Sequence, residues 1–441
     1  MWRWLVPGLH LKRWLALIGL GLVAVGIGLA WAFLAAHQPT RWRVPLVAGS
    51  VGVAAVVVGT LQVLRSLGRA FNVPQSSLAD WLMSRQRAVR GPRVVALGGG
   101  TGLPALLRGL KQYTSNITAI VTMADDGGSS GRLRGTLGML PPGDVRNCLV
   151  ALADAEPLMR DLFQYRFSEG ELTGHSFGNL FIAAMERTTG DFVTALGELS
   201  RVLAVRGAVY PVTLDPVRLA AELDDGTVVH GESQIGASQR PIRRVWLEPD
   251  DATPLVEAIR AIEQADLIVI GPGSLYTSVI PNLLVAPVAE AIRQSAAPTI
   301  YVANVMTQPG ETGGYTAYDH LAALEEHAGR PLVDVMVVND EAVPEAVRQR
   351  YREQGADAVL LGAPRGRRVS VAAAPLLAPG EVVRHDSDKL AAIVLRTLLD
   401  LKPDWVRRRP FESLALEQRL RQAREGNGDG VVAYARGQGR A

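Results

Sequence analysis

Cysteine is almost absent from this sequence of 441 residues, which contains only Cys148. A single cysteine excludes an intramolecular disulfide and a cysteine-rich zinc site, and it is typical of a reducing compartment. Cys148 stands in an apolar run, so we interpret it as a small buried side chain rather than a nucleophile. Because hydrophobic residues make up 48% and charged residues 20% of the chain, a disordered protein is excluded.

A basic excess is missing from the middle of the chain, although the net charge is +3 and the sequence pI is about 9.1. Residues 1–93 hold 11 basic residues and one acid, and residues 402–441 hold nine basic and five acidic residues. Residues 94–401 carry 26 basic and 37 acidic residues, a net charge of −11. Nucleic-acid binding depends on neutralising phosphates, so we expect no nucleic-acid partner.

Charge is also absent from two apolar stretches near the N-terminus, at about 15–36 and 44–64. As a helix, each is long enough to cross a hydrocarbon core of ~30 Å. The short link between them predicts an antiparallel transmembrane hairpin within residues 1–65, which serves as a membrane anchor. A cleaved signal peptide is the alternative, but the first apolar stretch is long for a signal and a second one follows.

The distribution of Lys and Arg predicts the orientation of this hairpin. Three basic residues precede the first span and residues 65–92 hold five, whereas the loop between the spans holds two. The positive-inside rule therefore places both termini in the cytoplasm of an inner or plasma membrane, as a multi-pass protein. Residues 66–92 form a basic juxtamembrane linker that can lie on anionic lipid.

Beyond residue 93, short apolar runs alternate with helical segments. Residues 150–210 have a mostly helical pattern, and residues 219–247 predict a β-hairpin insertion with Asp225-Gly226 as its turn. We expect a Rossmann-like α/β domain over 93–401, with a doubly wound, mostly parallel sheet and this helical and hairpin insertion, followed by an Arg-rich tail at 402–441. The predicted parallel strands are 93–97, 117–122, 265–270, 299–303 and 333–338.

Polar, glycine-rich loops follow four of these strands, at the edge where open α/β sheets bind ligands. Glycine lets backbone N–H groups approach a phosphate, and the next helix N-terminus stabilises it. The dinucleotide fingerprint is incomplete because Leu103 replaces a required glycine, and tight turns without a ligand are the alternative. The nucleotide- or phosphate-binding candidates in these loops are Gly98, Gly99, Gly100, Thr101, Gly102, Gly127, Gly128, Ser129, Ser130, Gly131, Arg132, Gly271, Gly273, Ser274, Tyr276, Thr277, Asn304 and Thr307.

Candidate ligands for Mg²⁺ follow the second predicted strand. Asp125 and Asp126 are adjacent carboxylates that can hold this ion or accept ribose hydroxyls, although a simple turn is the alternative. Asn179, Tyr351 and Arg384 complete the nucleotide-binding candidates, Arg384 because a forked guanidinium suits a diphosphate. No catalytic residue is identifiable from the sequence.

The sequence does not assign a role to five further side chains. Asp144 and Arg146 are either a helix cap with its ion-pair partner or ligand contacts, and Glu311 is a candidate base without an identifiable partner. His320 and His327, seven residues apart, are expected on a solvent-exposed helix face.

Six motifs, in this order, resemble the gluconeogenesis factor family. The resemblance covers about Arg93 to Leu401, and both ends of this chain depart from the family's usual pattern. The motifs are Gly98-Gly-Gly-Thr-Gly-Leu103, Asp125-Asp-Gly-Gly-Ser-Ser-Gly-Arg132, Pro141-Pro-Gly-Asp-Val-Arg-Asn147, Gly174-His-Ser-Phe-Gly-Asn-Leu180, Gly271-Pro-Gly-Ser-Leu-Tyr-Thr-Ser278 and Asn304-Val-Met-Thr-Gln-Pro-Gly-Glu-Thr312.

The resemblance implies a Rossmann-like nucleotide-binding fold with a cytoplasmic site. It also implies binding of UDP-sugars such as UDP-N-acetylglucosamine and a role in cell shape and envelope growth on gluconeogenic carbon. The family is similar in turn to the 2-phospho-L-lactate transferases of deazaflavin cofactor biosynthesis, which use Mg²⁺ and a guanylyl-activated phospholactate.

Three functions follow from these patterns. The first is a nucleotide-sugar-binding regulator without turnover, and the second is a Mg²⁺-dependent transferase acting on a nucleotide-activated phosphoester. The third, a nicotinamide oxidoreductase, is disfavoured by Leu103. The family resemblance favours the regulator, and a homo-oligomer is left open.

Overall fold

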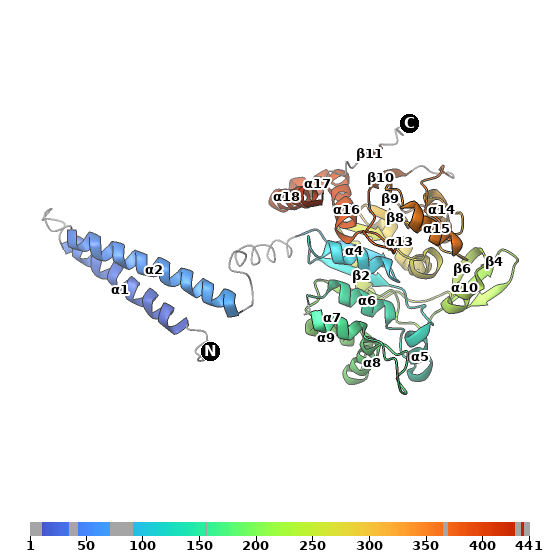
Figure 1. The fold of residues 1–441 in the computed structure, drawn as a ribbon, viewed down its shortest axis with the longest axis horizontal. Helices are drawn as coiled ribbons and strands as arrows, with labels where there is room; N and C mark the ends of the chain where they lie inside the picture. The colour runs from blue at the N-terminus through green and yellow to red at the C-terminus, as the bar shows by residue number, and fades with distance from the viewer. Residues whose placement is uncertain are drawn as a thin grey trace. The chain divides into compact units, whose positions relative to one another are not determined.

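The computed structural model describes residues 11–34, 43–70, 91–154, 157–364, 369–427 and 434–435. Contacts divide the chain into two compact units, Met1–Gln86 and Arg87–Ala441, which Figure 1 shows with their labelled elements. The link expected between the two apolar spans and most of the expected basic linker lie outside the described residues.

The first unit is a pair of helices, α1 (Leu11–Leu34) and α2 (Arg43–Ala70), which pack along each other. Glycine allows their backbones to approach, because a Cβ added to Gly52 would lie 2.7 Å from the Gly21 carbonyl oxygen. Among the described residues, the segment Arg13–Trp31 is the one helix long and apolar enough to span a bilayer, and the apolar part of α2 is shorter. The two predicted helices are present, whereas their insertion in a membrane stays a prediction.

An eight-stranded sheet forms the centre of the second unit, in the order β11-β10-β9-β8-β7-β1-β2-β3. The seven strands from β10 to β3 in this order run parallel, and β11 at the edge is antiparallel to β10. This confirms the expected α/β fold with a mostly parallel sheet. The strands are β1 (Val94–Gly98), β2 (Ile117–Val121), β3 (Ala208–Pro211), β7 (Leu267–Ile270), β8 (Thr299–Val302), β9 (Val335–Asn339), β10 (Ser370–Ala374) and β11 (Tyr434–Ala435).

The central strands form because their sequences are apolar, rich in β-branched residues and covered on both faces. Every residue of β1, β7 and β8 is buried. Val94 of β1 pairs with Ile117 of β2 on one side and with Leu267 of β7 on the other. The five predicted strands are therefore confirmed, and β3 and β10 are additional parallel members.

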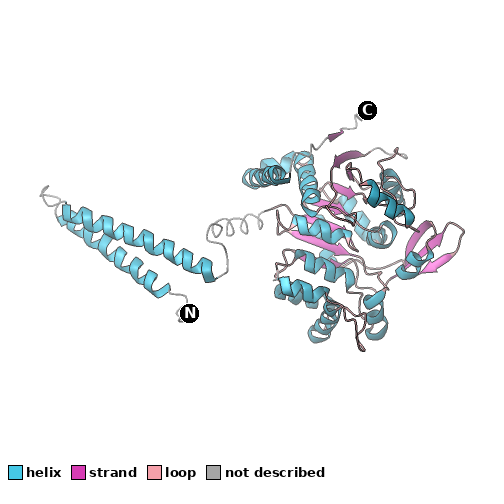
Figure 2. Cartoon of the chain, in the orientation of Figure 1, coloured by secondary structure: helices cyan, strands magenta, loops and turns pink. Residues whose placement is uncertain are grey.

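Helices enclose this sheet, as Figure 2 shows. On one face α4 packs against α6 and α16, and on the other α11 packs against α13 and contacts β2 and β3. The helices of this unit before its C-terminal pair are α4 (Gly102–Leu110), α5 (Gly128–Leu137), α6 (Gly143–Leu152), α7 (Pro157–Gln164), α8 (Phe177–Thr189), α9 (Phe192–Val202), α10 (Glu232–Ser238), α11 (Val256–Glu263), α12 (Ile280–Leu284), α13 (Ala286–Gln294), α14 (Ala317–His327), α15 (Glu345–Glu353) and α16 (Ser387–Leu401), with one π-helical turn at Leu275–Val279.

The predicted β-hairpin insertion is confirmed and is larger than expected. β4 (Arg218–Leu223) and β5 (Val228–His230) pair across the Asp225-Gly226 turn, and β6 (Ile242–Glu248) pairs with the other edge of β4. Helix α10 lies between β5 and β6, so the insertion is a three-stranded antiparallel sheet with its own helix.

Two helices follow α16. They are α17 (Pro403–Arg408) and α18 (Pro410–Asn427), and both pack against α16. Trp405 and Leu416 are buried members of the main hydrophobic core. A large part of the segment expected as an Arg-rich tail therefore belongs to the folded second unit.

Candidate functional site

The sheet changes direction at β1. β2 and β3 lie on one side of it, and β7 to β10 lie on the other. The loops that leave the carboxyl ends of β1 and β7 therefore diverge, which opens a crevice at this point in doubly wound sheets. A cavity of about 720 Å³ lies here, within the usual range for a small-molecule site.

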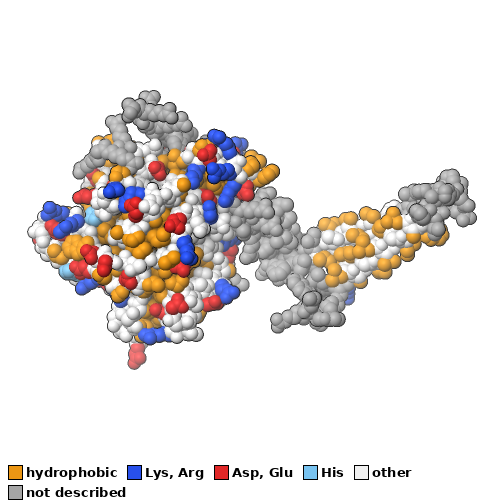
Figure 3. All heavy atoms as spheres, turned by 180° about the vertical axis from the view of Figure 1, so that it is seen from behind, with side chains coloured by type: hydrophobic (Ala, Val, Ile, Leu, Met, Phe, Trp, Pro, Cys, Tyr) orange, Lys and Arg blue, Asp and Glu red, His pale blue; other side chains and the backbone are white. Residues whose placement is uncertain are grey.

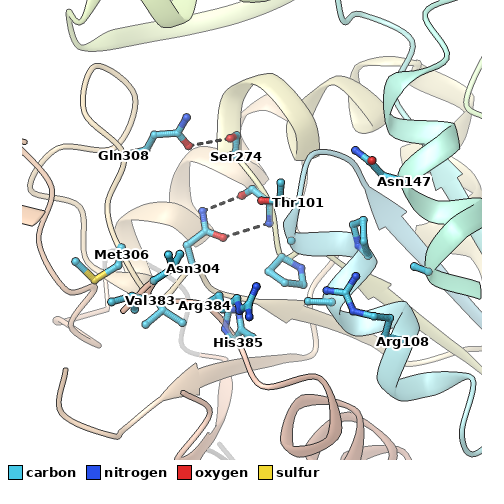
Figure 4. Close-up of a pocket in the computed structure, with 18 of the residues that line it drawn as sticks. Thr101, Arg108, Asn147, Ser274, Asn304, Met306, Gln308, Val383, Arg384 and His385 are labelled. Carbon is cyan, nitrogen blue, oxygen red and sulfur yellow. Dashed lines mark hydrogen bonds between the residues drawn. The ribbon is translucent and has the colours of Figure 1, made fainter. Parts of the chain in front are cut away.

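Loops after β1, β7 and β8 and the segment before α16 surround this cavity. Asn304 joins two of them, because its side-chain amide accepts from the Gly273 N–H at 3.2 Å and donates to the Gly273 carbonyl at 2.8 Å. Ser274 donates to Gln308 at 2.8 Å, as Figure 4 shows. The sequence candidates that line the cavity are Thr101, Gly102, Gly273, Ser274, Asn304, Thr307 and Arg384.

The cavity is lined by cations and by no acid among the described residues. Arg108 and Lys111 come from α4, Arg160 from α7 and Arg384 from the segment before α16. Figure 4 shows Arg108 and Arg384 entering from two sides. Burial, and then repulsion from Arg384, lower the pKa of Arg108, and no ion pair is found for either guanidinium in the described part of the chain. The pair is therefore arranged for an anion.

Beside Arg384, His385 is part of the same wall of the cavity. Burial lowers the pKa of His385 to about 4, against a hydrogen bond with the Ala303 backbone. The ring is therefore neutral at pH 7, and its buried Nε2 has no partner among the described residues. Tyr351 lies behind this segment and its hydroxyl oxygen accepts the Val383 N–H at 3.1 Å, so Tyr351 supports the wall without lining the cavity.

Carboxylates gather on the other side of the glycine loop. Asp144, in the first turn of α6, lies directly beneath this loop. Its carboxylate fits there because Gly99 has no Cβ atom, and a Cβ at that position would overlap the carboxylate. Burial, together with the charge of Asp125, raises the pKa of Asp144 to about 6, against a hydrogen bond from the Gly100 N–H. Burial also raises the pKa of Asp125, although Asp125 accepts the Gly127 N–H at 2.9 Å.

The adjacent carboxylate, Asp126, has a different partner. It accepts the Ser233 N–H at 2.8 Å and so holds the start of α10. The same helix carries Glu232, whose pKa is raised to about 9 by burial and then by the charges of Asp125 and Asp144. Among the described residues, no group of three or more His, Cys, Asp or Glu side chains is arranged to hold a metal ion.

The polar candidates of the second loop contact the start of α8. Ser129 bonds to the His175 ring at 3.3 Å, and Arg132 donates to the Thr173 carbonyl at 2.9 Å. Arg146 donates to Asn179 at 2.9 Å and also to Ser176. Arg146 therefore holds the first turn of α8. None of the sequence candidates in the second loop and at the start of α8 lines the cavity; these are Gly127, Gly128, Ser129, Ser130, Gly131, Arg132 and Asn179.

Tyr276 and Thr277, in the π-helical turn after β7, are buried and have protein partners. Tyr276 bonds to the Tyr315 hydroxyl at 2.8 Å, and Thr277 donates to Glu311 at 3.2 Å. Burial raises the pKa of Glu311 to about 7. These side chains thus connect the loops after β7 and β8.

The expectation of solvent exposure for two histidines of α14 is wrong. His320 is fully buried and its Nδ1 bonds to the Thr316 carbonyl at 2.8 Å. The His327 Nε2 accepts the Val245 N–H at 3.0 Å, which ties α14 to the insertion. Both rings fill an aromatic cluster, and a seven-residue spacing alone could not tell which face of the helix is covered.

The arrangement has clear relatives. The family model described as 2-phospho-L-lactate transferase CofD matches residues 94–377. The gluconeogenesis factor of Halalkalibacterium halodurans is 50% identical over 306 residues, which cover 68% of this chain and 95% of that protein. The chain belongs to the gluconeogenesis factor family. The Bacillus subtilis gluconeogenesis factor is 49% identical over 311 residues, 70% of this chain and 98% of its own.

The family's solved structures match the second unit. The crystal structure of a UPF0052 family member from Bacillus halodurans is 50% identical, with a TM-score of 0.65, and covers 68% of this chain and 99% of its own. A relative from Clostridium acetobutylicum is 42% identical over 438 residues, 96% of this chain and 97% of its own. Gluconeogenesis factors therefore occur in a shorter and a longer form, and the end segments are not peculiar to this chain.

Proposed function

We propose that this gluconeogenesis factor binds a nucleotide sugar, with UDP-N-acetylglucosamine as the expected ligand, in the cavity at the β1–β7 switch point. Through that ligand it would regulate cell shape and envelope growth on gluconeogenic carbon. The observation that supports this is the facing pair Arg108 and Arg384, which lies in a cavity without acidic lining residues in the described chain. A diphosphate between two guanidiniums offsets their repulsion and accepts forked hydrogen bonds from both.

The neighbouring polar groups suit the rest of such a ligand. Thr101 and Gly102 stand at the start of α4, where free backbone N–H groups and the helix dipole favour an anion. Asn304 and Ser274 offer amide and hydroxyl groups at the opposite wall.

The proposal includes a membrane anchor formed by α1 and α2. Their outward side chains are apolar and exposed; Leu20 and Val47, for example, are 69% and 62% exposed. Exposed apolar surface along a whole helix pair is unfavourable in water and suits a lipid environment. With this anchor, the positive-inside rule predicts from the distribution of Lys and Arg that the nucleotide-sugar site faces the cytoplasm.

A second function, a Mg²⁺-dependent transferase of the 2-phospho-L-lactate transferase type, is favoured by Asp125 and Asp144. Mg²⁺ binds through one or two carboxylates together with waters and substrate phosphates, and two partly buried carboxylates beside a glycine loop fit that requirement. When bound, the ion would neutralise charge on a nucleotide-activated phosphoester. In this function Asp125 and Asp144 hold the ion, while Asp126 positions α10.

Isothermal titration of the detergent-solubilised full chain separates the two functions. UDP-N-acetylglucosamine, UDP-glucose, GDP and NAD are each titrated with and without Mg²⁺. The regulator predicts heat with a UDP-sugar and none with NAD. Tight GDP binding that requires Mg²⁺, together with no heat from either UDP-sugar, would refute the regulator and favour the transferase.

Fractionation tests the anchor. Membranes from cells that express the full chain are washed with high salt and then with alkaline carbonate, which remove peripheral proteins. We expect the chain to stay in the membrane pellet. Release into the carbonate supernatant would show that α1 and α2 are not inserted.

A further inference from the structure

The outer face of α18 is amphipathic. Phe411 is 85% exposed and Leu414 is 65% exposed, and Arg421 continues the same stripe two turns later. These positions share one face of a helix by their spacing, while Ser413 and Leu416 on the opposite face are buried against the core. Nothing in the described chain covers the exposed apolar pair.

Arginines border this apolar pair. Arg407 and Arg408 are exposed at the end of α17, one turn before Phe411. Among the described residues, these two arginines have one ion pair, between Arg407 and Asp404 at 4.0 Å; both side chains are largely exposed to water, so this pair is weak. Figure 3 shows blue and orange side chains together on the edge of the second unit that carries these helices.

The chain enters the second unit at the same place. A hollow of about 330 Å³ is lined by Gly91 together with α18 residues that include Phe411 and Leu414. Gly91 is the first described residue after α2. Gly91 therefore lies beside the exposed stripe.

We propose that this surface, defined as Arg407, Arg408, Phe411, Leu414 and Arg421 and called the α17–α18 surface, docks on the anionic lipid surface of the membrane that holds α1 and α2. The inference rests on the membrane anchor of the proposed function. Phe411 and Leu414 enter the boundary between headgroups and acyl chains, and the three guanidiniums bind lipid phosphates.

Two features favour lipid over a protein partner. Two large apolar side chains are too few for the core of a stable protein interface, which buries about 800 Å² on each partner. A tethered domain, in contrast, needs only weak lipid contacts, because the anchor already keeps the local concentration of membrane high. Residues 71–90 can span up to ~70 Å when extended, which is ample for this contact.

The lone buried cysteine makes a site-specific probe possible. Cys148 is fully buried, so Leu414→Cys can be labelled selectively with an environment-sensitive fluorophore in the full chain. The labelled protein is reconstituted into vesicles of phosphatidylcholine alone or with phosphatidylglycerol, with brominated lipids as quenchers. Val256→Cys, at a site 56% exposed on α11, is the matched control. Retention after a carbonate wash of the same vesicles reports on the anchor.

We expect a blue shift and quenching for the Leu414 probe in anionic vesicles only, and neither for the Val256 probe. Each of Arg407→Gln, Arg408→Gln and Arg421→Gln should lower the ratio of docked to undocked probe about fivefold. An unshifted Leu414 probe in anionic vesicles overturns the inference, even where the anchor survives carbonate. An equal shift in neutral vesicles also overturns the inference, because it indicates apolar contact that does not depend on lipid charge. A shift that depends on protein concentration in detergent without lipid overturns it as well, because it indicates self-association. Carbonate release with a shifted probe refutes only the anchor.

Discussion

Replacing Arg108 with Gln tests the nucleotide-sugar site most directly. A hydrogen bond from a guanidinium to a diphosphate contributes about 2 kcal/mol, which corresponds to about thirtyfold in Kd. We therefore expect Arg108→Gln and Arg384→Gln each to weaken UDP-sugar binding about thirtyfold. Arg108 and Arg384 repel each other in the free protein, and neither has an ion pair in the described chain. Removing one charge should therefore leave the Tm of the ligand-free protein unchanged or raise it.

Titration calorimetry and thermal unfolding of the same samples give both quantities. Arg201→Gln on α9 is the matched control, because the Arg201 side chain is 78% exposed and, within the described residues, its one ion pair is with Glu198 of its own helix. It should change Kd less than twofold. A fall in Tm with unchanged Kd for Arg108→Gln would show that the guanidinium has a structural role, and the argument from the unpaired cations would be refuted.

Three further predictions concern the carboxylates and the core. The pKa of Asp144 in the folded protein, about 6, exceeds its reference value of 3.8, so protonation of Asp144 favours folding below pH 4, and this contribution to stability disappears as the pH rises through 6. Asp144→Asn should therefore stabilise the Mg²⁺-free protein by about 3 kcal/mol at pH 7.5 and have little effect at pH 4. A lower Tm of this variant at pH 7.5 would contradict the prediction. Asp125→Asn should abolish Mg²⁺-linked GDP binding, and an unchanged Mg²⁺ dependence would remove Asp125 from any metal site. Leu97→Ala, in the fully buried β1, should cost about 3 kcal/mol in urea unfolding, and a cost below about 1 kcal/mol would be inconsistent with its packing.

The strands that could be predicted are those whose own residues are enough to indicate a strand. β1, β7 and β8 are short, mostly apolar runs rich in β-branched residues and buried on both faces, a pattern that favours a central parallel strand. β10 was not predictable in the same way, because three of its five residues are alanine, which has low strand propensity. It is a strand because β9 offers it a paired edge. β3 is four residues long and ends at Pro211, so its pattern is too short to detect.

The features of the candidate site likewise fall into those that the local sequence indicates and those that depend on tertiary packing. Parallel strands bring their carboxyl ends to one edge, so the loops at Thr101, Gly273 and Asn304 could be expected to meet. The approach of Arg108 to Arg384 could not, since it depends on α16 folding back over α4. Tyr276 was predicted to contact a ligand because it follows a glycine turn, but a π-helical turn directs the whole segment inward. Burial of that kind is decided by tertiary packing.

The central place of β1 has a consequence for the order of synthesis. β1 begins the folded unit, yet one of its two edges is paired by β7, which starts more than 170 residues later at Leu267. At about 5–20 residues per second, a ribosome needs ~10–30 s to supply that partner. During this interval the apolar edge from Val94 to Leu97 has no sheet neighbour. The backbone N–H of Arg93 likewise waits for the carboxylate of Asp266, to which it donates at 2.9 Å in the finished protein.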